Sequence, residues 1–285
     1  MPSPRCERSR SIVRLATPEK TNNVTLNVGN TVGVVGVDLN ADLGESFGSW
    51  RLGDDDALLD VITSANVACG FHAGDPSTLA RTVKAAALRG VRIGAQVSYP
   101  DLVGFGRRRM DVAPDDLTAD VLYQIGALDA FCRANSTRVA YVKPHGALYN
   151  RIVDDEQQAQ AVVAAIAQWD DDLPLVTIAG SVAAEVARAA AVHVVAEVFA
   201  DRAYTDEGRL VDRRKAGAVL HDAATIADRV VGMVVDGVVT AQTGQPVPVQ
   251  ADSVCVHGDT PDAVSIARAV RHALGAAGVT VRPWS

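Results

Sequence analysis

The sequence predicts an α/β fold: a parallel (β/α) barrel of about seven strands. Short runs rich in β-branched residues alternate with longer Ala-rich stretches of helical spacing, about seven times after residue 34. Strand followed by helix, repeated in this way, is typical of a parallel sheet with crossover helices. An open doubly wound sheet fits the same pattern. The closed barrel is favoured because the last strand–helix unit is as well formed as the first.

The expected elements follow from this alternation. The β-branched runs predict strands at Val34–Leu39, Ala65–Cys69, Val91–Val97, Arg138–Val142, Leu175–Ile178, His193–Phe199 and Ser253–Val256. The helical spacing predicts helices at Asp54–Thr63, Ser77–Leu88, Pro114–Ala134, Glu156–Trp169, Val182–Ala190, His221–Val235 and Pro261–Leu274. Asp75 and a proline precede the second helix and Gly90 follows it, as helix start and stop signals require.

One domain is expected over residues 34–285, because no linker rich in Pro, Gly or Ser divides them. Two excursions leave the alternation: Ala200–Ala218, an active-site loop or small hairpin insertion, and Val238–Pro248, with a turn at Thr243-Gly244. Residues 1–33 lack the apolar core and cleavage site of a secretory signal. We expect them to be a disordered N-terminal extension, or the product of a start codon assigned too early.

Composition argues against several classes of function. The 285 residues carry 27 Lys and Arg against 34 Asp and Glu, a net charge of −7, which disfavours a nucleic-acid or anionic-membrane partner. No run of about 18 apolar residues is present to span a membrane. The four cysteines, Cys6, Cys69, Cys132 and Cys255, form no CxxC pair, so we expect free thiols in a reducing cytoplasm.

Polar residues at the strand ends are the main indication of function, because the loops there converge on the mouth of a barrel. After the first strand, Asp38, Asn40 and Asp42 share one face through the strand period of two. Three unpaired polar groups on a buried face would cost several kcal/mol, so this face is expected to border a wet or ligand-filled interior. The alternative is that Asp42 and Glu45 cap the next helix.

Two further strands end in imidazoles and a lysine. His72 lies between Gly70 and Gly74, which allow the backbone to turn sharply and present the ring inward. Lys143 and His145 fall on one face of the fourth strand. We therefore expect a cation and two imidazoles to enter the same interior as the acidic residues of the first strand.

The remaining strand ends add candidates. The third strand carries Gln96 and is followed by Arg107 in a glycine-flanked arginine run, which either closes over an anionic substrate or is simply solvated. The sixth strand contributes an inward carboxylate, Glu197, and a possible pair between Asp201 and Arg202.

The remaining histidines and the absence of several motifs limit the kinds of reaction that the sequence predicts. His257, after the seventh strand, is either a site residue or a capping neighbour, whereas His193, His221 and His272 are expected to be structural or exposed. The sequence holds no GxSxG elbow, phosphate loop, HExxH or GxGxxG motif. Carboxylates, histidines and a lysine around one pocket are the equipment of general acid–base hydrolysis, with or without a metal.

Several long strings occur in a recognisable order. They are VDLNADLGE (37–45), ANVACGFHAGD (65–75), KPHGALYN (143–150) and EVFADR (197–202), with GFGRR (104–108) and VHGD (256–259) as further matches. Together they resemble the signatures of the LamB/YcsF family, from about Val37 to the C-terminus. The resemblance implies a barrel of the glycoside hydrolase/deacetylase type.

The family is described as the A subunit of the prokaryotic ATP-dependent 5-oxoprolinase. The resemblance therefore implies a part in opening 5-oxo-L-proline to L-glutamate, in a complex with two further subunits, B and C. ATP, with Mg²⁺ as its expected counterion, is then a co-substrate of the complex. Many members carry a histidine where this chain has Gln96, and glutamine is a poor metal ligand, so the presence of a metal is left open.

With this substrate the candidate residues receive hypothetical roles. The catalytic set is Asp38, Asp42, His72, His145 and Glu197, in which Asp38 or Asp42 orients or deprotonates water and the imidazoles are acid–base partners. The substrate-binding set is Asn40, Glu45, Gln96, Arg107, Lys143, Asp201, Arg202 and His257, in which Lys143 and Arg202 hold the carboxylate or a developing phosphate charge.

Two alternatives stay open. One is a metal-dependent deacetylase of N-acetylated sugars, with an ion such as zinc held by His72 and His145. The other is a non-catalytic subunit that binds the lactam while its partners do the chemistry.

Overall fold

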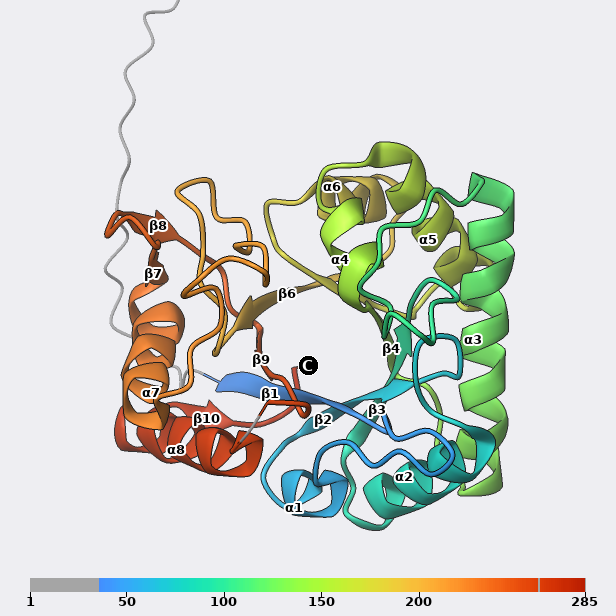
Figure 1. Ribbon diagram of the computed structural model, residues 1–285, viewed down its shortest axis with the longest axis horizontal. Helices are drawn as coiled ribbons and strands as arrows, with labels where there is room; N and C mark the ends of the chain where they lie inside the picture. The colour runs from blue at the N-terminus through green and yellow to red at the C-terminus, as the bar shows by residue number, and fades with distance from the viewer. Residues whose placement is uncertain (1–35, 261, 285) are drawn as a thin grey trace, which may run out of the picture. The chain divides into compact units, whose positions relative to one another are not determined.

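The computed structural model describes residues 36–260 and 262–284, in which seven parallel strands close a barrel (Figure 1). The strands are β1 (Gly36–Leu43), β2 (Ser64–Ala68), β3 (Arg92–Val97), β4 (Tyr141–Pro144), β5 (Leu175–Thr177), β6 (Val194–Phe199) and β9 (Ser253–Val256). Each strand pairs in parallel with the next, and β9 pairs back with β1, where Asn40 lies opposite Cys255. The predicted barrel is confirmed, because this last pairing closes the sheet.

Helices surround the strands (Figure 1). They are α1 (Asp55–Leu59), α2 (Pro76–Leu88), α3 (Pro114–Ala134), α4 (Gly146–Ile152), α5 (Glu156–Trp169), α6 (Val182–Ala189), α7 (Ala223–Val231), the π-helical turn η1 (Gly232–Asp236) and α8 (Ala263–Ala276). The side chains that cap α1, α2, α5, α6 and α7 are Asp54, Asp75, Asp155, Ser181 and Asp222. Each such cap stabilises its helix by about 1 kcal/mol, which is why the helices begin where the capping residues occur.

Three helical segments differ from the sequence-based expectation. Helix α4 was not predicted and begins directly after the polar residues that end β4. Helix α1 stops at Leu59, because the backbone of Thr63 already donates to Leu39 O at 2.8 Å and leads into β2. The segment predicted as one helix over 221–235 is α7 followed by η1.

Strand β1 runs to Leu43 and not to Leu39, where the prediction ended it. Its polar residues suggested a loop, but the barrel interior supplies them with polar partners, so the backbone stays extended. Strand β4 begins at Tyr141, three residues later than expected. A short strand, β10 (Thr280–Val281), was missed and pairs with the first two residues of β1.

Both predicted excursions are present. Strands β7 (Val238–Thr240) and β8 (Pro246–Pro248) form an antiparallel hairpin across the expected Thr243-Gly244 turn. The segment 200–218 folds back on itself, with antiparallel bridges between Tyr204 and Leu210 and between Arg202 and Val219. This segment therefore has the character of a small hairpin insertion.

The two faces of β1 show how the barrel divides polar from apolar. Leu39, Ala41 and Leu43 belong to the apolar core cluster, and burying each leucine stabilises the fold by about 1.5–3 kcal/mol. On β3, a Cβ at Gly94 would collide with the Tyr141 ring, so the glycine gives that ring its room. The outer layer is therefore apolar and the interior carries the polar groups.

The described cysteines Cys69, Cys132 and Cys255 are buried free thiols, as predicted, and Cys6 lies outside the described residues. So do residues 1–33, on which the extension was expected. Among the described helices, none is long and apolar enough to cross a membrane.

Candidate active site

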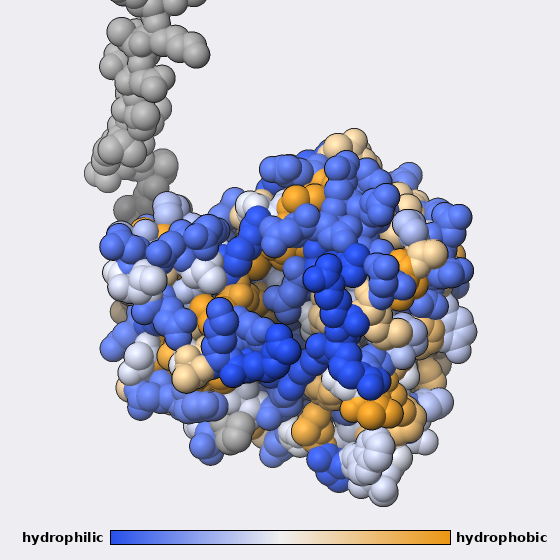
Figure 2. All heavy atoms as spheres, turned by 45° about the horizontal axis from the view of Figure 1, so that its top comes forward, coloured by the Kyte–Doolittle hydropathy of each residue, from blue (hydrophilic) through white to orange (hydrophobic). Residues whose placement is uncertain are grey.

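A cavity of about 940 Å³ opens at the carboxyl ends of the barrel strands. Its lining includes the side chains of Asp42, Lys143, His145, Tyr149, Phe199 and His257 together with arginines 107–109, 151, 202, 213 and 214. Figure 2 shows hydrophilic side chains gathered around a hollow on this face. The strand-end residues therefore meet at one mouth, as the barrel requires.

Lys143 lies at the centre of this interior and is 2% exposed. Its Nζ lies 2.9 Å from Asp42 Oδ1, 3.1 Å from Glu197 Oε1 and 2.9 Å from Cys255 Sγ. Burial opposes the ammonium, but Asp42, Cys255 and Glu197 together outweigh it and raise the pKa of Lys143 well above its usual value. In the same way burial opposes the Asp42 carboxylate, yet Lys143 holds its pKa below the usual value. At neutral pH the two form a buried ion pair.

Amide groups hold this ion pair in place. Asn66 donates to Asp42 Oδ1 at 2.8 Å and to Asn40 Oδ1 at 2.7 Å, and it accepts from the Tyr141 hydroxyl at 2.7 Å. Asn40 in turn donates to Glu197 Oε1 at 3.0 Å. The sequence analysis did not single out Asn66. Its place on β2 beside the acidic strand was the available signal.

Asp38 takes no part in the cavity. Its carboxylate accepts hydrogen bonds from Thr63 at 2.7 Å, Ser64 at 2.6 Å and Ser253 at 2.5 Å. Burial raises the pKa of Asp38, and the three hydroxyls limit that rise. It points inward like Asp42, as the strand period predicts, but lies four residues earlier on β1. Its geometry is that of a structural carboxylate, which does not support the catalytic role assigned from the sequence.

Two stacked imidazoles form a second group. The rings of His72 and His145 lie 4.3 Å apart with an angle of 20° between them. His72 Nε2 lies 3.1 Å from Gln96 Oε1, whose amide donates to Glu45 Oε1 at 3.2 Å, and His145 Nε2 lies 3.8 Å from that same oxygen. Of these four residues, His145 lines the cavity. Gln96 thus connects an imidazole to a carboxyl.

Burial controls the charge of this group. It lowers the pKa of His72 to about 4, and together with His72 it lowers the pKa of His145 well below the usual value. Burial and then the Asp42 carboxylate raise the pKa of Glu45 well above its usual value. At neutral pH both imidazoles are therefore neutral, which leaves His145 able to accept a proton at the cavity wall.

The loop after β3 closes over the imidazoles. Gly106 has φ +67°, and a Cβ there would collide with Ser98 Oγ and lie 3.0 Å from His145 Nδ1. Phe105 packs edge-on against both imidazole rings. Arg107 then reaches across the mouth to Asp259, with Nη2 2.5 Å from Oδ2. The glycine-flanked arginine run thus places one arginine in an ion pair at the cavity rim.

A third group consists of His257, Asp201 and Thr260. His257 Nδ1 lies 2.8 Å from Asp201 Oδ1, and the Thr260 hydroxyl donates to Asp201 Oδ2 at 3.1 Å. Burial would raise the pKa of Asp201, but His257, Arg213 and Thr260 together outweigh it and the pKa is lowered. Arg202 donates instead to the backbone oxygens of Val211 at 2.6 Å and Ala218 at 3.3 Å. Asp201 and Arg202 therefore do not pair with each other: Asp201 contacts His257, and Arg202 binds the backbone of the segment 200–218.

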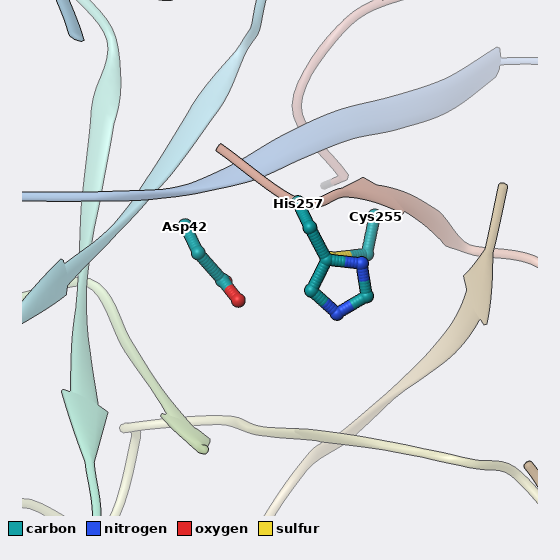
Figure 3. Close-up of side chains that lie close together, drawn as sticks. All are labelled: Asp42, Cys255 and His257. Carbon is teal, nitrogen blue, oxygen red and sulfur yellow. The ribbon is translucent and has the colours of Figure 1, made fainter. Parts of the chain in front are cut away.

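Two sets of residues are close enough to be examined as metal sites. Ligand atoms of Asp42, Cys255 and His257 lie within 4.8 Å of one another, and their side chains point into the same interior (Figure 3). Lys143 Nζ already contacts the first two of these, so an ammonium supplies the positive charge there. The set does not fit a resident ion.

Glu45, His72 and His145 meet the same distance criterion. An imidazole binds a metal along its ring plane, and two nearly parallel stacked rings cannot both direct a nitrogen at one ion without rotating. This set is therefore a poor fit in the arrangement observed, and no step of the chemistry below is routed through a metal.

Five buried side-chain atoms of the described residues have no hydrogen-bond partner: Nδ1 of His72, Nδ1 of His145, the Tyr149 hydroxyl, Glu197 Oε2 and Arg213 Nη2. Burial and then the nearby Glu197 carboxyl raise the pKa of Tyr149 well above its usual value. Tyr149 lines the cavity and packs edge-on against Phe199, with ring centroids 5.3 Å apart. The sequence analysis missed Tyr149 as a site residue, because helix α4, which carries it, was not predicted.

Sequence comparisons find 5-oxoprolinase A subunits of other organisms among the proteins similar to this chain. A 5-oxoprolinase A subunit from Mycobacterium avium is 60% identical over 251 residues, 88% of this chain and 100% of that protein. One of the 5-oxoprolinase A subunits of Pseudomonas syringae pv. tomato is 57% identical over 249 residues, 87% of this chain and 97% of that protein.

Solved structures agree as well. A lactam utilization protein from Thermus thermophilus has a TM-score of 0.83 at 46% identity, covering 88% of this chain and 100% of that one. A putative cellobiose-phosphate cleavage protein from Enterococcus faecalis V583 has a TM-score of 0.51 at 11% identity, covering 88% and 98%, and shows the fold alone. The model of the LamB/YcsF family matches residues 37–285, and the chain belongs to that family.

Proposed function

We propose that this chain is the A subunit of an ATP-dependent 5-oxoprolinase and opens the ring of 5-oxo-L-proline to give L-glutamate. The family match and relatives named as 5-oxoprolinase A subunits, at 55–60% identity, support the assignment. The B and C subunits are the expected partners, and the cytoplasm, which supplies ATP and keeps thiols reduced, is the expected compartment.

The observation that carries the proposal is the meeting of Asp42, Lys143, His145 and His257 at one cavity. Opening a lactam requires a water made nucleophilic, charge stabilisation at the carbonyl oxygen and a proton for the departing nitrogen. His145, neutral at pH 7, accepts the proton of the water. Asp42 orients that water, because its carboxylate is already held in the ion pair with Lys143. Lys143 supplies the positive charge.

The arginines at the rim give the site its selectivity for an anion. The substrate carries a carboxylate, and arginine binds carboxylate or phosphate oxygens through paired donors. Arg107 is the best placed, because it lines the cavity and its guanidinium is held there only by an ion pair with the partly exposed Asp259. When the substrate binds, Arg107 releases Asp259 and pairs with the substrate carboxylate instead. Arg202, held by backbone oxygens, supports the loop.

The stability of the lactam explains why the reaction requires ATP. A five-membered lactam is a stable amide whose hydrolysis near neutral pH is slow and not strongly downhill. Phosphorylation of the amide oxygen activates the amide carbon toward water, so that the ring nitrogen can leave and the resulting acyl phosphate is hydrolysed to glutamate and phosphate. ATP, with Mg²⁺ as its counterion, is the co-substrate of the complex, and the arginine rim suits the added phosphate charge.

The test is reconstitution of the chain with its two proposed partners, followed by measurement of glutamate release from 5-oxoproline with ATP. We expect release by the complete complex and its loss, by at least a hundredfold, with Asp42→Asn. Asp171→Asn, at an exposed surface aspartate, is the matched control and keeps full activity. A complete complex that releases no glutamate contradicts the assignment, and an unimpaired D42N complex would make this chain a binding subunit only.

A further inference from the structure

The imidazole of His257 has one nitrogen committed and one free to face a ligand. Nδ1 lies 2.8 Å from Asp201 Oδ1, which leaves Nε2 as the nitrogen available to the cavity that His257 lines. Figure 3 shows the ring beside the Asp42 carboxylate in the same interior. An imidazole held in this way has its tautomer and orientation fixed by the carboxylate behind it.

The carboxylate behind the ring is itself held. Asp201 is 0% exposed and receives the Thr260 hydroxyl on its second oxygen at 3.1 Å. The face of the His257 ring stacks on Phe199, with centroids 5.5 Å apart and an angle of 22°. Because the carboxylate, the hydroxyl and the aromatic ring fix position and plane together, His257 is a rigid and directed donor.

The two histidines at the cavity differ in what surrounds them. His145 is stacked on a second imidazole, and burial keeps it neutral. His257 instead has a buried carboxylate as its direct partner, in contact with Nδ1. Two imidazoles held by different partners at one cavity are suited to act as the base and the acid on one substrate.

On the basis of the proposed function, we infer that His257 donates the proton to the lactam nitrogen and that Asp201 is its positioning residue. Water adds to the phosphorylated lactam carbon and gives one proton to His145, while the ring nitrogen takes the proton of His257 Nε2. The bond between that carbon and the nitrogen then breaks, its electron pair stays on nitrogen, and His145 returns its proton there to complete the amine. The new hydroxyl becomes a carbonyl and its proton returns to His257 through solvent. The product is an acyl phosphate, which a second water hydrolyses to glutamate and phosphate, so two waters are consumed.

The experiment uses the reconstituted three-subunit complex with His257→Gln, with Asp201→Asn and with His272→Asn, an exposed histidine on α8, as the control. We expect H257Q and D201N to lower kcat by about a hundredfold or more, with KM within threefold of the wild type. H272N keeps the wild-type kcat. Wild-type kcat in H257Q overturns the inference.

A second substrate separates proton donation from binding. The five-membered lactone carboxylate, with oxygen in place of the ring nitrogen, has a leaving group that needs an enzyme proton far less. H257Q is expected to open the lactone with a loss at least tenfold smaller than its loss on the lactam. An equal loss on both substrates overturns the role of proton donor.

The Asp201–His257 contact can be measured without any activity. In ¹⁵N spectra of the isolated chain, His257 Nδ1 is expected to show a proton hydrogen-bonded to Asp201, and D201N to shift that signal. This measurement serves if H257Q does not fold, and an unshifted signal contradicts the positioning role. A wild-type complex that releases no glutamate would instead refute the proposed function, so the two failures are distinguishable.

Discussion

Lys143 and Asp42 form an ion pair inside the barrel, with Nζ 2.9 Å from Oδ1 and at most 3% of either side chain exposed. Glu197 shares the same ammonium from β6 at 3.1 Å. One cation therefore holds two carboxylates from β1 and β6, the strands on either side of β9. The arrangement is stable only as a set, because removing one member leaves a charge in a medium that solvates it poorly.

Lys143→Met is expected to destabilise the fold by about 3–5 kcal/mol, because it leaves the Asp42 and Glu197 carboxyls buried without a cation. Urea unfolding at pH 7 measures the change. Lys84→Met, at an exposed lysine on α2, is the control and is expected to change stability by less than about 0.5 kcal/mol. The double variant with Asp42→Asn should recover part of the loss. Full stability in K143M would mean that the ion pair is not formed.

Acid is expected to destabilise the fold through His72. Its pKa falls from 6.5 to about 4 on folding, so the unfolded chain binds the proton more readily. The contribution of neutral His72 to the free energy of unfolding is fully present above pH 6.5. It is lost as the pH falls toward 4, by up to about 3 kcal/mol. Glu45, whose pKa is raised, acts in the opposite sense as the pH rises. The measurement is therefore the difference between wild type and His72→Asn in urea unfolding at pH 7.5 and 5. An identical pH slope in both contradicts the burial of a neutral imidazole.

Gly106→Ala is expected to lower both stability and activity. The left-handed φ of +67° costs an L-residue about 1–2 kcal/mol, and the new Cβ would also press on Ser98 Oγ and the His145 ring. Gly278→Ala is a matched control, because it has φ +78° with open space around the Cβ position. Thermal unfolding of both variants separates backbone strain from collision. Equal losses in the two would show that the loop yields to the added methyl group.

Tyr149→Phe is expected to leave stability unchanged or slightly higher, because the hydroxyl is buried without a partner among the described residues. KM for 5-oxoproline should rise about tenfold, equivalent to about 1.4 kcal/mol for one hydrogen bond to the lactam. Tyr123→Phe, at an exposed tyrosine, is the control and should leave KM unchanged. A marked loss of stability in Y149F would show that the hydroxyl serves the fold and not the substrate.

The sequence by itself determined the barrel and the gathering of its polar residues. Alternating strands and helices fix a parallel sheet, and parallel strands end at the same edge. The period of two along β1 and β4 placed Asp42 and Lys143 on inward faces, and their 101-residue separation did not matter. These features depend on local periodicity, which a single sequence displays directly.

Only the tertiary structure decided what each of those residues contacts. Asp38 and Asp42 share a face but lie at different depths in the barrel. Asp38 therefore accepts hydrogen bonds from three hydroxyls, whereas Asp42 pairs with Lys143. Asp201 pairs with His257 rather than with its neighbour Arg202, because the chain turns between them and their side chains diverge. The depth of a side chain in the barrel and the residues it contacts depend on strand stagger and on contacts between distant segments. Local sequence patterns do not encode either of these.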